Sequence, residues 1–397
     1  MSSDVDSPPP KLWQAVLMLW LAGNALRITI LAIPPVLATI RDDFALSATQ
    51  VGLLSSIPPA LFAIASLVGS LLVMKLGLKR ALVGGLLIVA IGSALRGLSP
   101  NYSVLFITTV VMSIGVAIMQ PIMPTGVRQW MPQRVGTGTA IYTNGLLVGE
   151  TLPVMCAASL VLPLVHGSWR MSLVVWSVPI ALIALFVWWA APHDHHDATV
   201  SIGAPRKWLP DWHKGLVWRL GLLFACFNTI YFSTNAFMPI YLASVGRSDL
   251  IGSALTALNL GQLPASLLLL FVAQRLERKA WAYVWSGLLS LAGVVGIALD
   301  VGPVATVWWA GLLGFANAAA LIVGLTLPPL LCERDDVPRT AAGMFTISYA
   351  TAVVLSTLSG AMWDLSGIPM LAFAPIAAIS MGLVVIAMYM RAKGELI

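Results

Sequence analysis

Two ionisable residues lie near the middle of long apolar stretches of the chain. Arg27 is central in the stretch 12–40, and Glu150 is close to the centre of the stretch 136–163. An arginine at the middle of a bilayer costs about 2.5–3.5 kcal/mol on insertion scales, and such residues usually face a cavity. Both residues are therefore candidates for a function.

The types of these two residues suggest which chemistry they could perform. A guanidinium group stays charged and offers a planar fork of donors that suits carboxylate-, cyanate- or nitrate-like groups. We expect Arg27 to bind an anionic substrate. We expect Glu150 to take up a proton when the anion occupies Arg27, which would couple anion movement to protons. The alternative is a permanent ion pair that holds the two spans together.

Uncharged polar residues form a second candidate set for substrate binding. Asn228, Tyr231 and Asn235 follow the spacing i, i+3, i+7, so they share one face of a helix. Further polar residues occur within apolar stretches: Asn24, Gln120, Tyr142, Asn144, Asn259, Gln262 and Tyr349. We expect these side chains to line a cavity. For any one of them, a hydrogen bond between helices is the alternative.

The other reactive residue types predict neither an enzyme nor a cofactor. The sequence has no nucleotide-binding loop and no plausible pair of nucleophile and base, so we expect a gradient to drive transport. The three cysteines lie in or at the ends of apolar stretches, and no disulfide framework is implied. The run His193–Asp197 has metal-capable side chains but no second ligand cluster, so we predict no metal site.

The composition indicates which elements must position these side chains. Of the 397 residues, 59% are hydrophobic and 10% are charged, whereas a soluble domain carries about 25% charged residues. A membrane-spanning helix needs about 20 apolar residues. We therefore predict an all-α membrane protein with twelve transmembrane helices. The predicted spans are 12–40, 49–74, 81–99, 103–126, 136–163, 171–191, 215–242, 251–273, 281–299, 304–331, 341–363 and 369–390.

Lysine and arginine are distributed unequally over the segments between the spans. With the N-terminus inside, 17 of the 22 fall on the inner side and Arg27 lies within a span. The other four, on the outer side, are Arg41, Arg96, Arg170 and Arg247. This bias predicts a multi-pass protein of a bacterial inner membrane with both termini cytoplasmic. The net charge of +6 is then an orientation signal, and the expected partner is the lipid bilayer and not nucleic acid.

A weak internal repeat divides the chain into two halves. The longest polar stretch, 192–214, separates a six-helix half, 1–191, from a second one, 215–397. Asn24 and Pro35 match Asn228 and Pro239 at an offset of 204 residues, and other matches follow in the same order. Two pseudo-symmetric halves suggest a substrate path between them that opens alternately to either side.

Twelve spans, a central cytoplasmic loop and a 6+6 repeat resemble the major facilitator superfamily. That family carries the pattern G-x-x-x-D-[R/K]-x-G-x-[R/K]-[R/K] between spans two and three, as a cytoplasmic gate loop. Four residues match it here: Lys75, Gly77, Lys79 and Arg80. Ser70 replaces the first glycine and Met74 replaces the aspartate, so the charge relay built on that aspartate is not expected.

Within the superfamily, the chain resembles the branch of cyanate permeases and nitroimidazole transporters. The similarity rests on Arg27 with Pro35, and on the strings Leu95–Pro100, Gln120–Pro124 and Leu260–Gln262. The resemblance implies a monomeric secondary transporter of a small solute, with an anion as substrate and with protons or an exchanged solute as the coupled species. The alternative substrates are neutral or weakly basic drug-like compounds, carried outward by an efflux permease.

Overall fold

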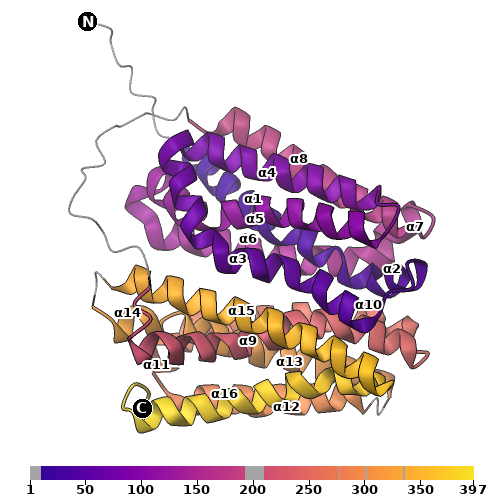
Figure 1. Ribbon diagram of the computed structural model, residues 1–397. Helices are drawn as coiled ribbons and strands as arrows, with labels where there is room; N and C mark the ends of the chain where they lie inside the picture. Colours follow the sequence, from indigo (N-terminus) through magenta and orange to yellow (C-terminus); the bar gives the residue numbers. More distant parts are fainter. Residues whose placement is uncertain (1–9, 193–209, 277, 300–301, 334–335) are drawn as a thin grey trace, which may run out of the picture. The chain divides into compact units, whose positions relative to one another are not determined.

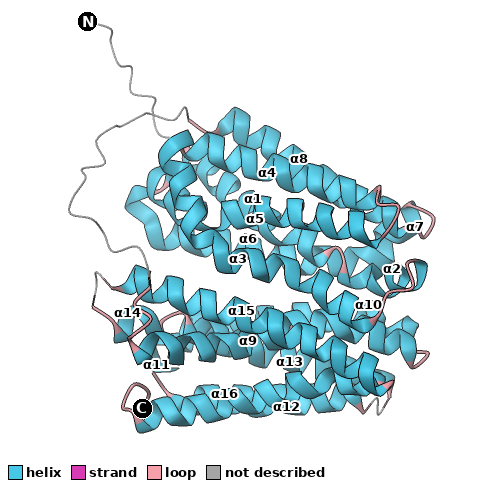
Figure 2. Cartoon of the chain, in the orientation of Figure 1, coloured by secondary structure: helices cyan, strands magenta, loops and turns pink. Residues whose placement is uncertain are grey.

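The computed structural model describes residues 10–192, 210–276, 278–299, 302–333 and 336–397. These residues form helices and loops, and no strand occurs among them (Figure 2). Ten helical segments in this part of the chain are long and apolar enough to cross a membrane. They agree with ten of the predicted spans, and the prediction of an all-α membrane protein is confirmed.

The described residues form two compact units, and each has its own helices. One unit contains the described residues up to Ile33, Ile64–Cys156 and those from Leu160 to Pro192. Its helices (Figure 1) are α1 (Leu12–Leu31), α4 (Leu78–Gly97), α5 (Tyr102–Trp130), α6 (Val135–Cys156), α7 (Leu162–Leu164), α8 (Trp169–Ala190) and the part of α3 (Ala48–Leu76) from Ile64 on.

The second unit contains Pro34–Ala63, Ala157–Ser159 and the described residues from Pro210 on. Its helices are α2 (Leu37–Asp43), the first part of α3, α9 (Gly215–Ser244), α10 (Ile251–Leu260), α11 (Gln262–Leu276), α12 (Ala280–Ala298), α13 (Pro303–Gly324), α14 (Leu327–Leu331), α15 (Val337–Ser366) and α16 (Ala374–Ala392). The division into halves, 1–191 and 215–397, concerns the sequence repeat and stays a prediction.

The two remaining predicted spans also coincide with helices. The span 49–74 corresponds to α3, which has 29 residues. The span 251–273 is divided at Gly261 into α10 and α11. Pro264 has no N–H to donate to the carbonyl of Leu260, so the regular bonding pattern stops there.

The first predicted span, 12–40, is interrupted in the second half of its length. α1 is followed by a 3-10 turn, Pro34–Val36, and then by α2. Pro34 and Pro35 have no backbone N–H, so carbonyls one turn earlier lose their helical donors. The boundary between the two compact units lies at this interruption, directly after Ile33.

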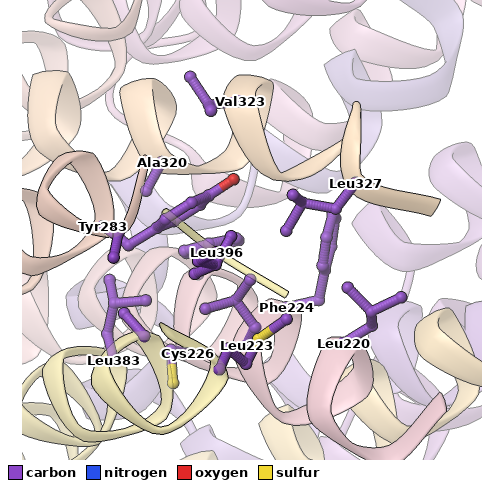
Figure 3. Packing of buried hydrophobic residues seen from close by; sticks show 14 of the residues in the cluster. Leu220, Leu223, Phe224, Cys226, Tyr283, Ala320, Val323, Leu327, Leu383 and Leu396 are labelled. Atoms are coloured by element: carbon purple, nitrogen blue, oxygen red, sulfur yellow. The ribbon is translucent and has the colours of Figure 1, made fainter. Parts of the chain in front are cut away.

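The second unit has an apolar core around the first turns of α9 (Figure 3). Phe227 meets Phe224 edge to face at 5.4 Å between ring centroids and stacks on Tyr283 of α12 at 6.3 Å. Leu396 is 2% exposed and belongs to the same core. This packing holds α9 in place directly before its most polar turns, which start at Asn228.

Candidate functional site

α1 and α6 approach closely because glycines of α6 face the backbone of α1. An added Cβ at Gly145 would lie 2.2 Å from the carbonyl oxygen of Trp20, and one at Gly149 would lie 2.4 Å from that of Asn24. A spacing of four between two glycines is a common pattern where membrane helices pack backbone to backbone. The close approach brings the two ionisable residues of these helices within reach of each other.

Arg27 and Glu150 form a buried ion pair between α1 and α6. The Arg27 Nε and the Glu150 Oε1 are 3.0 Å apart, and the side chains are 10% and 6% exposed. Opposite charges in a poorly solvated place attract strongly, whereas either charge alone would be costly there. The two residues singled out in the sequence thus meet, while the roles predicted for them in binding and proton coupling stay predictions.

Four other predicted residues of this unit lie on α1, α5 and α6. Asn24 is 2% exposed; its Nδ2 donates to the carbonyl of Trp20 at 2.9 Å, and its Oδ1 has no hydrogen-bond partner among the described residues. Asn144 is exposed and accepts a hydrogen bond from Trp20 Nε1 at 2.9 Å. Tyr142 and Gln120 are half-buried. Trp20 was not predicted from the sequence as a site residue, although a tryptophan within a span and not at its end can indicate a polar contact.

In the second unit, three predicted residues form one hydrogen-bonded network. The Tyr231 hydroxyl donates to Asn259 Oδ1 at 2.9 Å, and Asn259 Nδ2 donates to Asn235 Oδ1 at 3.0 Å. Asn235 Nδ2 donates to the carbonyl of Tyr231 at 3.0 Å, which closes the network on α9. All three side chains are under 9% exposed. α9 and α10 are therefore tied together by buried polar groups, as the helix-to-helix alternative expects.

Two further predicted polar residues of this unit are buried outside that network. Asn228 is 8% exposed, and its Nδ2 donates to the Ser348 hydroxyl of α15 at 2.7 Å. Gln262, at the start of α11, is 4% exposed. The shared face of α9 thus serves two partners, with Asn228 bonded to α15 and the later polar residues bonded to α10.

Tyr349 lies in an aromatic cluster. Its ring is edge to face with Phe62 of α3 at 5.3 Å and with Phe232 of α9 at 6.4 Å, and it stacks on Phe345 at 6.0 Å. Phe62 and Phe232 were not singled out in the sequence, because phenylalanines in apolar helices carry no signal of their own. Phe62, Phe232 and Tyr349 are each under 9% exposed, so the cluster is part of the buried packing of this unit.

Of the predicted gate loop, only Gly77 lies between α3 and α4, whereas Lys75 belongs to α3 and Lys79 and Arg80 belong to α4. Gly77 has a φ of 84°, a left-handed value that glycine tolerates best, so the pattern needs a glycine there. Lys79 Nζ donates to the carbonyl of Ala191 at 2.7 Å, and Arg80 is exposed. The side chain of Lys75 lies outside the described residues.

No group of three or more His, Cys, Asp or Glu side chains in the described residues could hold a metal ion. The run His193–Asp197 lies outside this part of the chain. The charged residues that are buried in this described part are Arg27, Glu150 and a second arginine, Arg96.

Comparison with known proteins agrees with the membrane helices. The chain is 26% identical to a 2-nitroimidazole transporter of Escherichia coli strain K12 over 347 residues, which is 87% of both chains. It is also 26% identical to the cyanate transport protein CynX of the same strain over 386 residues, which covers 94% of this chain and 95% of the other. An uncharacterized transporter of Bacillus subtilis strain 168, YycB, is 24% identical over 358 residues.

Solved structures of transporters have the same fold. A bacterial homologue of the human lysosomal transporter Spinster superposes with a TM-score of 0.75 over 96% of both chains at 18% identity. The nucleoside transporter NupG gives a TM-score of 0.75 over 95% of this chain and 98% of its own at 15% identity. A family model described as Major Facilitator Superfamily matches residues 17–250, more than half of the chain. The protein is therefore a membrane transporter, not an enzyme, and belongs to the major facilitator superfamily.

Proposed function

We propose that this transporter moves a small anion together with a proton across the inner membrane by alternating access. Arg27 is the counter-charge of the anion, and Glu150 accepts the proton. The observation that supports this proposal is the buried ion pair between α1 and α6, with 3.0 Å between Nε and Oε1. The cyanate transport protein among the relatives is consistent with an anion as cargo.

The coupling follows from the charge balance of the pair. With Glu150 ionised, the pair is neutral and the carboxylate holds the guanidinium. When Glu150 is protonated, Arg27 is left with a net positive charge, which a bound anion neutralises again. The two intermediate states, with a proton alone or an anion alone, leave one buried charge uncompensated and are costly. Proton and anion therefore bind together, and an inward proton gradient drives uptake.

Uptake in proteoliposomes tests the proposal directly. Purified protein is reconstituted, the outside is acidified, and uptake of labelled cyanate is followed over time. We expect the wild type to accumulate cyanate only with the proton gradient. Glu150→Gln should bind cyanate but lose the response to the gradient, because position 150 can no longer ionise. Arg27→Ala should lose binding and uptake. Full dependence on the gradient in Glu150→Gln would refute the coupling.

Efflux of neutral or weakly basic compounds is the second candidate function. Arg27 and Glu150 already pair with each other within the protein, as a structural pair would. The buried network of Tyr231, Asn235 and Asn259 then supplies hydrogen bonds to the cargo, and one relative carries the name of a 2-nitroimidazole transporter. Binding of cyanate, nitrate and 2-nitroimidazole to the purified protein separates the two functions. Anion binding that is lost in Arg27→Ala supports proton-coupled anion transport. Binding of 2-nitroimidazole that is unchanged in Arg27→Ala supports efflux of neutral or weakly basic compounds.

We also propose that both termini are cytoplasmic and that the protein acts as a monomer. The orientation rests on the excess of 17 inner over four outer basic residues. The oligomeric state is tested by light scattering of the purified protein with correction for bound detergent.

A further inference from the structure

The end of α1 lacks several of its normal hydrogen-bond donors. In a regular helix the carbonyl of Thr29 would accept from the N–H of Ile33, four residues later. Here the N–H of Ile33 donates to the carbonyl of Ile30 at 3.4 Å. The next two positions are Pro34 and Pro35, which have no N–H. The last turn of α1, directly after Arg27, therefore depends on donors from other elements.

Arg96 of α4 supplies one of these donors. Its Nη2 donates to the carbonyl of Thr29 at 2.9 Å, and the side chain is 0% exposed. Arg96 forms no ion pair with a described residue, and its Nε and Nη1 have no hydrogen-bond partner among them. The bond to Thr29 is thus the one polar contact that this guanidinium makes in the described part of the chain.

A cation at this place has a physical reason. The carbonyl end of a helix carries a partial negative charge, which an arginine close to it stabilises both by hydrogen bonding and by its charge. Burying a guanidinium within a membrane protein costs free energy. The bond to the carbonyl end of α1 offsets part of this cost. The distribution of basic residues predicts Arg96 on the outer side of the membrane, whereas the structure buries its side chain in the last turn of α4.

We infer that Arg96 is a positioning residue for transport, acting through the last turn of α1 on Arg27. Thr29 is two residues after Arg27, about 3 Å farther along the helix axis. On the other side of Arg27, Asn24 packs against Gly149 of α6. Arg27 is therefore held between a close backbone contact and a cap. Without the cap, the turn that carries the guanidinium would fray toward the proline interruption, and its geometry at Glu150 would be lost. The inference rests on the proposed role of Arg27 as counter-charge of the anion.

Four variants and two measurements test this inference, and one of the variants, Arg27→Ala, tests the proposed role of Arg27 itself. Arg96→Gln removes the charge and weakens the cap, Arg96→Lys keeps the charge, and Ser93→Ala is the matched control. Ser93 lies one turn earlier on α4, is also 0% exposed and donates to the carbonyl of Leu173, not to α1. Hydrogen–deuterium exchange of peptides covering residues 26–33 reports on the cap. The dissociation constant of cyanate for the folded, purified protein reports on the position of Arg27.

We expect Arg96→Gln to speed exchange of this peptide and to weaken cyanate binding, each by roughly tenfold, as for loss of a helix cap. Arg96→Lys should recover part of both effects, and Ser93→Ala should change neither. An unchanged exchange rate in Arg96→Gln would overturn the inference. So would faster exchange in Arg96→Gln together with wild-type cyanate binding, provided that Arg27→Ala has lost cyanate binding. Wild-type binding in Arg27→Ala itself would instead refute the proposed function, and the role of Arg96 with it.

Discussion

At the scale of single residues, the described helices compensate their buried charges in two different ways. Arg27 and Glu150 neutralise each other across 3.0 Å. Arg96 has no carboxylate partner among the described residues and faces the carbonyl end of α1. The two arginines thus differ in kind. One is paired with a group that can change its protonation state, while the other contacts a backbone carbonyl that cannot.

Exchanging the two charges of the pair tests whether it also contributes to stability. Arg27→Glu and Glu150→Arg each place two like charges together, and breaking a buried ion pair costs about 3–5 kcal/mol. We expect both single variants to lower the apparent melting temperature. The double variant should recover most of this loss, because the opposite charges face each other again. Thermal unfolding of the wild type, the two single variants and the double variant, followed by fluorescence, measures the coupling between the two residues. If the changes of the single variants simply add up in the double variant, the two residues are not coupled.

At the scale of elements, two contacts between segments far apart in the sequence hold helices in place. Close packing of α1 on α6 depends on glycines, and the start of α3 depends on a carboxylate of α15. Ser47 and Gln50 cap each other at this start, with 2.9 Å from Ser47 N to Gln50 Oε1 and 3.2 Å from Gln50 N to the Ser47 hydroxyl. Asp364 accepts from the next two backbone amides, those of Ala48 at 2.8 Å and Thr49 at 2.7 Å. The free amides of the first turn are thereby satisfied.

Replacing Gly149 tests the close packing. An added Cβ would lie 2.4 Å from the carbonyl oxygen of Asn24, so Gly149→Ala must push α1 and α6 apart. Overpacking of this kind costs about 1–3 kcal/mol, and we expect lower thermal stability together with weaker cyanate binding. Gly84→Ala is the control, because an added Cβ there meets nothing within 4 Å and alanine favours the helix. Equal behaviour of the two variants would contradict the packing argument.

Replacing Asp364 tests the cap of α3. Besides the two amides, its carboxylate accepts from the Thr49 hydroxyl at 2.5 Å. Loss of a helix cap costs about 0.5–2 kcal/mol. We expect Asp364→Ala to reduce the free energy of unfolding by about this amount, and Asp364→Asn to reduce it less, because an amide keeps one acceptor oxygen. Urea unfolding in a mild detergent measures the free energy of unfolding of each variant. An Asp364→Asn variant that is less stable than Asp364→Ala would refute the expected order.

At the scale of the whole molecule, the described residues group into two compact units, and the chain passes between them inside predicted spans. One boundary follows Ile33, where the two prolines interrupt the first span. Another lies within α3, directly after Ala63. The segment Pro34–Ala63 therefore belongs to the same unit as α9 and α15, and its contacts include the aromatic pair of Phe62 and Tyr349 at 5.3 Å.

The orientation of the molecule can be measured with single cysteines. In a background with Cys156, Cys226 and Cys332 replaced by serine, His213→Cys lies before α9 and Ser168→Cys lies before α8. The bias of basic residues predicts that position 213 is cytoplasmic and position 168 is outside. We expect an impermeant maleimide to label position 168 in intact cells and position 213 only after permeabilisation. The reverse pattern would contradict the predicted orientation.

The sequence alone was enough for the all-α membrane class, for most span positions and for identifying Arg27 and Glu150 as buried charges. Hydropathy and the cost of a buried charge are local properties, so they can be read from neighbours along the chain. Only the tertiary structure decided which polar groups meet. Tyr231 with Asn259, Arg96 with Thr29 and Asp364 with Thr49 are separated by 28, 67 and 315 residues. Such pairs depend on the register of helices packed side by side, which is decided by contacts between residues far apart in the sequence.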